Sequence, residues 1–300
     1  MEKPYILHML SPGRNVSPFD VNMACDAGFN VVVPYTGVEL EEVTALVQDA
    51  IFSRGPSGAK RTGIFIGGRE VGLAADMLEQ ARQAMVPPFE VSVFADPSGA
   101  FTTAAAMVAA VEHWLQQARG VGLAGRRVLI FGGTGPVGTC AGVIAAQSGA
   151  EVHLVSHRSE VEARKVADAY NARYGVEMQG ASSATDQDRA AILQDAEVVM
   201  GAAKAGVQVL TAADLGHASK LMVAVDVNAV PPAGIEGVGV NDKGKVLDTT
   251  PGKAVGIGAL AVGNVKYAVQ QDLFQRMLKT DKPLYLDFRD AFQVARQHVG

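Results

Sequence analysis

The sequence predicts an α/β protein of two domains, of which the second is a Rossmann-type dinucleotide-binding domain. Three observations lead to this fold class. Apolar, β-branched runs alternate with amphipathic or Ala-rich stretches, the order that is typical of parallel sheets covered by helices. The glycines cluster directly after the apolar runs, where strands turn into helices. The length of 300 residues favours two domains over one.

The first domain is expected to contain residues 1–119, a parallel-sheet domain in which a strand-then-helix order repeats. Its expected strands are residues 5–9, 31–33, 63–66 and 91–95. One helix is expected to begin near Ser17, and three others are expected at residues 39–52, 70–85 and 102–117. Residues 53–61 are polar and contain glycine and lysine, so we expect a loop there.

The second domain is expected to cover residues 120–270 and to bind NAD(P). Its expected strands are residues 128–131, 152–155, 198–200 and 221–225. Residues 271–300 return to a helical pattern after the nucleotide domain is complete, so we expect these C-terminal helices to join the first domain. This arrangement predicts an active-site cleft between the two domains.

Composition excludes several classes of protein. Lys and Arg number 26 against 31 Asp and Glu, so the chain lacks the positive stripe that nucleic-acid binding requires. Its apolar runs are shorter than the roughly 18 to 20 residues of a membrane span, and no secretory signal precedes them. Cys25 and Cys140 lie far apart, and the six histidines have no metal-ligand spacing. We therefore expect a cytoplasmic protein without a metal site.

A glycine-rich turn follows the first strand of the second domain and opens an apolar helix. In this context the GxGxxG spacing indicates a dinucleotide site, because the helix N-terminus presents N–H groups to a pyrophosphate. The first glycine would form the tight turn, the second would admit the pyrophosphate, and the third would allow close packing of helix on strand. The candidate residues are Gly133, Thr134, Gly135, Pro136, Val137 and Gly138.

The end of the next strand carries Ser156, His157 and Arg158 where an NAD-specific site would carry a carboxylate. An arginine suits the ribose phosphate of NADP, so we favour NADP over NAD. Two other interpretations stay open: Arg158 can be a solvated surface residue, and Glu160 can bind a ribose hydroxyl. Further coenzyme candidates follow later strand-like runs or lie in the glycine-rich run near residue 256; they are Gly201, Ala202, Asp226, Asn228 and Gly256.

Asp20 is the first candidate outside the nucleotide domain. It follows Ser17 by three residues, with Pro18 between them, which is the spacing of a helix capping box. Helix capping alone can therefore explain this carboxylate. The alternative is that Asp20 binds substrate in the expected cleft.

The segment DPSGAFTT connects an expected strand to an expected helix and contains three further polar candidates. We expect their side chains at the edge of the sheet that faces the cleft. The candidates are Asp96, Thr102 and Thr103. Thr102 is equally suited to be a helix N-cap. Lys266 follows the glycine-rich run, where its ammonium either reaches the substrate or extends along apolar neighbours to water.

The chain also resembles a known family, the NAD(P)-dependent methylene-tetrahydromethanopterin dehydrogenases of bacterial one-carbon and formaldehyde oxidation. The similar stretches run nearly end to end; they are SPFDVNMACDAGF, VVVPYTGV, IFSRGPSGAKRTGIFIGG, VFADPSGAFTTAAAMV, VLIFGGTGPVG, VDVNAVPPAGI and GIGALAVGNVKY. The resemblance implies oxidation of a methylene group bridging two pterin nitrogens, with hydride passing to the nicotinamide. It also implies that Asp20, Thr102 and Lys266 line the pterin site, and that Asp20 and Lys266 are catalytic.

Two alternatives to this function stay open at the level of sequence. The same hydride chemistry on methylene-tetrahydrofolate differs in the pterin's tail and ring substituents more than at its reacting carbon. A noncatalytic NADP sensor would need the nucleotide domain but not the polar residues of the first domain. The resemblance further implies a homo-oligomer with a small-molecule pterin as substrate, whereas the charge balance and the short apolar runs predict that neither nucleic acid nor a membrane is a partner.

Overall fold

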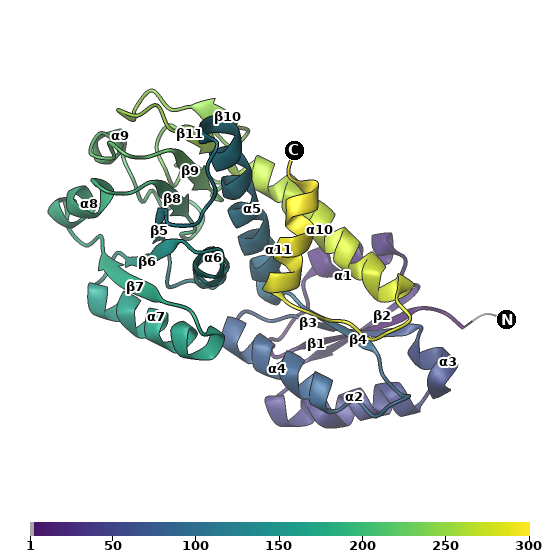
Figure 1. Cartoon of the computed structure of the whole chain (residues 1–300). Coiled ribbons are helices and arrows are strands. Elements are labelled where there is room, and N and C mark those ends of the chain that lie inside the picture. Colours follow the sequence, from purple (N-terminus) through teal and green to yellow (C-terminus); the bar gives the residue numbers. More distant parts are fainter. Residues whose placement is uncertain (1–2) are drawn as a thin grey trace. The chain divides into compact units, whose positions relative to one another are not determined.

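The computed structural model describes residues 3–300, which form two sheets, each within its own compact unit (Figure 1). Unit 1 contains residues 3–102 and 267–294, and unit 2 contains residues 103–266 and 295–300. The α/β class and the presence of two sheets, both predicted from the sequence, are confirmed. Within residues 3–300, no helix is both long and apolar enough to cross a membrane.

Unit 1 is built on a five-stranded sheet in the order β12-β4-β3-β1-β2, in which all neighbours are parallel. The strands are β1 (Ile6–Ser11), β2 (Val31–Thr36), β3 (Thr62–Ile66), β4 (Ser92–Ala95) and β12 (Tyr285–Leu286). The first four match the expected strands. The fifth was not expected, because two residues within a helical tail carry no strand pattern of their own.

The helices of the first hundred residues follow the predicted order with two differences. They are α1 (Pro18–Ala27), η1 (Leu40–Glu42), α2 (Val43–Phe52), α3 (Gly55–Ala59), α4 (Val71–Gln83) and η2 (Pro97–Gly99). The expected helix 39–52 divides into η1 and α2. The loop expected at residues 53–61 contains the short helix α3, which Pro56 initiates in its first turn.

The C-terminal helices supply part of the core of unit 1. They are α10 (Ala259–Lys279) and α11 (Phe288–His298). The Phe274 ring of α10 lies 5.5 Å from Phe65 and 5.3 Å from Phe94, measured between ring centroids. Phe288 makes an edge-on contact with Phe101 at 5.2 Å. These aromatic side chains are fully buried, so the sheet and the C-terminal segment share one apolar core.

Unit 2 contains a seven-stranded sheet in the order β10-β11-β9-β8-β5-β6-β7. Its strands are β5 (Arg127–Phe131), β6 (Glu151–Ser156), β7 (Met178–Ser182), β8 (Val198–Gly201), β9 (Val223–Asp226), β10 (Lys243–Val246) and β11 (Val255–Ile257). Only β10 is antiparallel to its neighbour. Because β5 lies between β6 and β8, the chain reverses its direction of winding beside β5, where dinucleotides bind in this class of sheet.

The helices of unit 2 are α5 (Ala100–Arg119), α6 (Pro136–Gln147), α7 (Glu160–Tyr174), α8 (Asp186–Leu193) and α9 (Ala212–Leu215). Strands β7, β10 and β11 were not expected. The first two are edge strands whose sequences, MQGAS and KGKV, lack the apolar β-branched runs used to find strands. The third is only three residues long.

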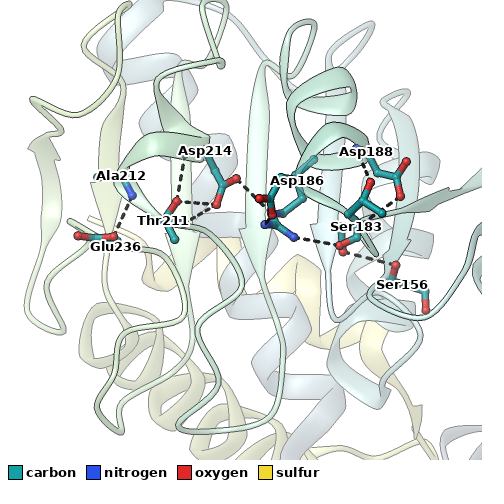
Figure 2. A network of polar contacts seen from close by, with 10 residues as sticks. Ser156, Ser183, Asp186, Asp188, Thr211, Ala212, Asp214 and Glu236 are labelled. Carbon is teal, nitrogen blue, oxygen red and sulfur yellow. Dashed lines mark hydrogen bonds and ion pairs between the residues drawn. The ribbon is translucent and has the colours of Figure 1, made fainter.

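A guanidinium ties α8 and α9 to the strands of unit 2 (Figure 2). Arg189 donates to Asp214 Oδ1 at 3.1 Å and to the Ser183 carbonyl at 3.2 Å, and it pairs with Asp186. Ser183 in turn donates its backbone N–H to the Ser156 carbonyl at 2.9 Å. The network therefore reaches from α9 to the end of β6. Burial raises the pKa of Asp214, but hydrogen bonds from Thr211 and Arg189 outweigh it and hold that pKa below its usual value.

We expect Arg189→Met to lower the free energy of unfolding by about 2 kcal/mol, because Asp214 would lose a charge-assisted partner while buried. Urea unfolding followed by circular dichroism measures the change. The matched control is Arg164→Met, whose ion pair with Glu160 joins side chains that are 64% and 50% exposed. That control should change stability by less than about 0.5 kcal/mol. Equal losses in the two variants would contradict a special role of Arg189.

Candidate active site

The turn between β5 and α6 is formed by glycines that have no space for a side chain. Gly132 has a φ of +73°, so the tight turn occurs one residue before the GxGxxG spacing. Gly133, to which the sequence assigns the turn, lies inside it, because Gly135 donates its N–H to the Gly132 carbonyl at 3.0 Å, but the positive φ belongs to Gly132. Gly133 instead allows close approach to the next strand, because an added Cβ would lie 2.6 Å from the Ile130 carbonyl oxygen and 2.8 Å from Leu154 Cα.

The other two glycines of the motif differ in how much space surrounds them. A Cβ on Gly138 would lie 2.5 Å from the Gly132 oxygen and 2.7 Å from Gly133 Cα, both backbone atoms, so only glycine lets α6 pack on the turn. The nearest atom to a Cβ on Gly135, the N-cap of α6, is 3.2 Å away. No side chain caps α6. Its first-turn N–H groups and helix dipole therefore suit an anionic ligand.

The carboxyl ends of β5, β6 and β8 bring several predicted coenzyme residues together. Ala202 donates its backbone N–H to the Phe131 carbonyl at 2.8 Å, and Gly132 packs against its backbone. Gly133 donates to the Val155 carbonyl at 3.4 Å. The glycine turn, Gly201–Ala202 and the end of β6 thus form one edge of the sheet. Thr134, Pro136 and Val137 lie on the same turn, half-buried or exposed.

Asp226 and Asn228 hold the loop that follows β9. The buried Asp226 carboxylate accepts backbone N–H groups from Asn228 at 3.1 Å, Gly234 at 2.7 Å and Ile235 at 3.1 Å. Burial raises its pKa, and these hydrogen bonds oppose the rise. The Asn228 side chain donates to the Pro232 carbonyl at 2.8 Å. Both side chains therefore have structural partners, and their contact with a coenzyme stays a prediction.

Gly256 lies inside β11, where a Cβ would be 2.8 Å from a Leu247 methyl carbon. This contact explains the glycine by packing alone. Its coenzyme role also stays a prediction.

A carboxylate that the sequence did not predict lies at the end of β6; it belongs to Glu162. Ser156 is buried and donates its hydroxyl to Glu162 Oε2 at 2.7 Å. Arg158 donates to Glu162 Oε1 at 2.7 Å, and its backbone N–H donates to the Ser156 hydroxyl at 3.1 Å. Glu160, the alternative considered above, instead pairs with Arg164 along the exposed side of α7. His157 is exposed beside this cluster.

Asp20 does not form the capping box that its spacing allows. Ser17 is the N-cap of α1 and Pro18 follows it, yet no side chain caps the helix. Asp20 is buried, with only 4% of the residue exposed, and its carboxylate accepts a hydrogen bond from Gln270 Nε2 at 2.8 Å. Gln270 is fully buried on α10, 250 residues away in sequence. The capping interpretation is therefore wrong, and Gln270 is a residue of this site that the sequence analysis missed.

Lys266 lies one turn before Gln270 on α10 and is half-buried. Residues four apart share a face of a helix, so Lys266 and Gln270 point from the same side of α10. This spacing was the one sequence signal that could have identified Gln270.

Asp96 and Thr102 lie together, at the start of α5. The Asp96 carboxylate accepts backbone N–H groups from Phe101 at 2.9 Å and Thr102 at 3.2 Å, and it accepts the Thr102 hydroxyl at 2.6 Å. The helix cap is therefore Asp96, and not Thr102 as the sequence allowed. Both side chains are fully buried, whereas Thr103 is half-buried. Contact of these three residues with a substrate stays a prediction.

Comparison with known proteins decides the family. Residues 18–98 match the model described as methylene-tetrahydromethanopterin dehydrogenase, N-terminal. An NAD(P)-dependent methylenetetrahydromethanopterin dehydrogenase of Methylorubrum extorquens is 52% identical over 295 residues, which are 98% of this chain and 99% of that protein. The chain belongs to the methylenetetrahydromethanopterin dehydrogenase family. The resemblance found in the sequence is thereby confirmed.

This member of the methylenetetrahydromethanopterin dehydrogenase family is also similar to a second curated protein in sequence and to a solved structure in fold. The bifunctional protein MdtA of Methylorubrum extorquens is 31% identical over 97% of this chain and 98% of its own. The crystal structure of shikimate 5-dehydrogenase from Listeria monocytogenes, in complex with shikimate and NAD, is similar with a TM-score of 0.51. The match covers 91% of this chain and 92% of that one at 13% identity, so it supports the fold alone.

For this methylenetetrahydromethanopterin dehydrogenase family member, we expect Gly138→Ala to weaken coenzyme binding by at least about tenfold. The added Cβ meets backbone atoms that cannot move without displacing the turn from the start of α6. Titration of NADPH fluorescence measures the dissociation constant. Gly72→Ala in α4 is the control, because a Cβ there meets open space. Unchanged binding by Gly138→Ala would contradict the assignment of this turn.

Proposed function

We propose that this protein oxidises methylene-tetrahydromethanopterin to methenyl-tetrahydromethanopterin and passes hydride to NADP or NAD. The family relationship over the whole chain carries the proposal. The glycine turn at the reversal point of the unit 2 sheet supports it, because that is where a nicotinamide coenzyme binds in this class of fold.

The chemistry of the pterin explains which groups the protein must supply. Lone pairs on the two nitrogens that flank the methylene carbon assist loss of hydride and leave a delocalised amidinium cation. No proton leaves in that step, so a catalytic base is unnecessary. When bound, the nicotinamide supplies the hydride acceptor. The protein must hold the reacting carbon about 3 to 3.5 Å from that acceptor and tolerate the new positive charge.

Asp20 suits the second requirement. We assign one of two roles to its carboxylate. It either stabilises the forming cation or binds the amide and guanidine-like edge of the pterin. The hydrogen bond from Gln270 fixes one carboxylate oxygen and so limits the orientations of Asp20. Lys266 suits a pterin carbonyl or ring nitrogen as a positioning group, because a cation beside a forming cation would oppose the reaction.

The first turn of α5 has a supporting role in this proposal. Since Asp96 and Thr102 are fully buried and bonded to each other, they hold the start of α5. Thr103, the next residue, is the one of the three whose side chain is partly exposed and suited to touch the pterin.

For the coenzyme we favour NADP, because Ser156 and Arg158 offer a hydroxyl and a guanidinium at the end of β6. The N–H groups at the start of α6 would receive the pyrophosphate. A homo-oligomeric state, a cytoplasmic location, independence from metal ions and the cleft expected between the domains stay predictions.

The test of this function is an assay with methylene-tetrahydromethanopterin that carries deuterium at the bridging carbon. With NADP or NAD supplied separately, we expect the deuterium to appear in the reduced coenzyme, because hydride transfers directly. Mass spectrometry of the nicotinamide measures the label. Absence of label in both coenzymes would contradict the proposal. Higher kcat/KM with methylene-tetrahydrofolate would instead assign the substrate to the folate series.

We expect Asp20→Asn to reduce kcat by up to about three orders of magnitude, because an ionised carboxylate near the forming cation is lost. Steady-state assays give kcat and KM, and coenzyme titration shows whether the variant is folded. Asp26→Asn is the matched control, because Asp26 is an exposed carboxylate on the same helix. If Asp20→Asn kept both kcat and KM, the carboxylate would have no role in the reaction.

A further inference from the structure

The cluster of Ser156, Arg158 and Glu162 at the end of β6 contains two opposite charges, the Arg158 guanidinium and the Glu162 carboxylate, where the coenzyme ribose is expected. Glu162 lies in the first turn of α7, and its backbone N–H donates to the Ser159 hydroxyl at 3.2 Å. Its side chain is directed back to the strand, where one oxygen accepts from Ser156 and the other from Arg158. A helix, and not the strand itself, thus delivers the carboxylate to the position where NAD-binding folds hold the ribose.

The two charges favour different coenzymes. A carboxylate accepts hydrogen bonds from the two adjacent ribose hydroxyls of NAD, and it repels the 2′-phosphate of NADP. A guanidinium does the opposite, since it binds the phosphate and gains little from a diol. In this protein the two groups neutralise each other in an ion pair. Neither coenzyme therefore meets a site built for it alone.

The ion pair is accessible enough for a ligand to compete with it. The Arg158 side chain is 69% exposed and that of Glu162 is 33% exposed. Pairs of this kind contribute little to stability, so an incoming phosphate or diol can replace one partner at small cost. The hydrogen bond from Ser156 and the charge of Arg158 lower the pKa of Glu162, which keeps its carboxylate ionised at neutral pH.

We propose that Glu162 sets the coenzyme selectivity of this enzyme, by accepting the ribose hydroxyls of NAD and by restraining Arg158 against the 2′-phosphate of NADP. This inference rests on the proposed coenzyme site. Glu162 lies six residues after the end of β6. The dinucleotide-binding sequence pattern expects the acidic residue at the strand end itself, so it does not identify Glu162.

The test uses two nucleotides that lack nicotinamide, so that it is independent of dehydrogenase activity. Isothermal titration calorimetry of the full-length protein with ADP-ribose and with 2′-phospho-ADP-ribose gives the two dissociation constants. For Glu162→Gln we expect binding of 2′-phospho-ADP-ribose to strengthen about tenfold and binding of ADP-ribose to weaken about tenfold. The ratio of the two constants should therefore change about a hundredfold.

Two further variants make the result decisive. Glu160→Gln removes the same charge from the same turn of α7, but from its outward side, and should leave both constants within about twofold. Arg158→Gln should weaken only 2′-phospho-ADP-ribose, and it provides the reverse shift if Glu162→Gln does not fold.

The outcomes separate this inference from the proposed function. If the wild-type protein binds both nucleotides but the ratio is insensitive to Glu162→Gln, or shifts equally with Glu160→Gln, the specificity role is overturned and the coenzyme site stands. If Arg158→Gln weakens both nucleotides alike, the opposition between the two charges is overturned. If the wild-type protein binds neither nucleotide, the coenzyme site and the inference fail together.

Discussion

Unit 2 depends on one steric constraint, the absence of a side chain at three glycines of the connection between β5 and α6. An added carbon would lie within 2.6 Å of a backbone atom at each of Gly132, Gly133 and Gly138: in the segment after β8, in β5 itself and in the turn, respectively. These contacts place the start of α6 directly above the strand end. They also bring the ends of β6 and β8 next to the turn, so the N–H groups at the start of α6 and the residues predicted to bind the ribose share one edge of the sheet.

Buried carboxylates occur at several strand ends and helix starts, and the structure shows that their uses differ. Asp96 caps α5, Asp226 holds the loop after β9, and Asp214 completes the capping box that Thr211 begins on α9 while bound to Arg189. Asp20 accepts a side-chain amide from α10, a distant part of the chain. A carboxylate held by a distant helix is fixed by tertiary packing and not by the local turn, which is why we assign the chemistry to Asp20.

The sequence predicted the elements whose pattern is local. Four strands of unit 1 and four of unit 2 have apolar β-branched runs, and the glycine turn has a fixed spacing, so these were found. Strands β7, β10 and β12 are edge strands that are polar or very short, and their pairing is decided by tertiary contacts. Gln270 was missed because its partner Asp20 lies 250 residues away, and its spacing from Lys266 is the one local signal. Glu162 was missed because its side chain is directed back from α7 to Ser156, six residues earlier, which a strand pattern does not reveal.

The position of Glu162 on an exposed helical turn has a consequence for evolution. A carboxylate carried by β6 itself, in place of the buried Ser156, would have to fit among packed neighbours. On α7 the corresponding group can change by a single surface mutation, with the central sheet untouched. If Glu162 sets the coenzyme selectivity as proposed, exchanging NAD for NADP as the hydride acceptor requires no change in the buried strands of unit 2.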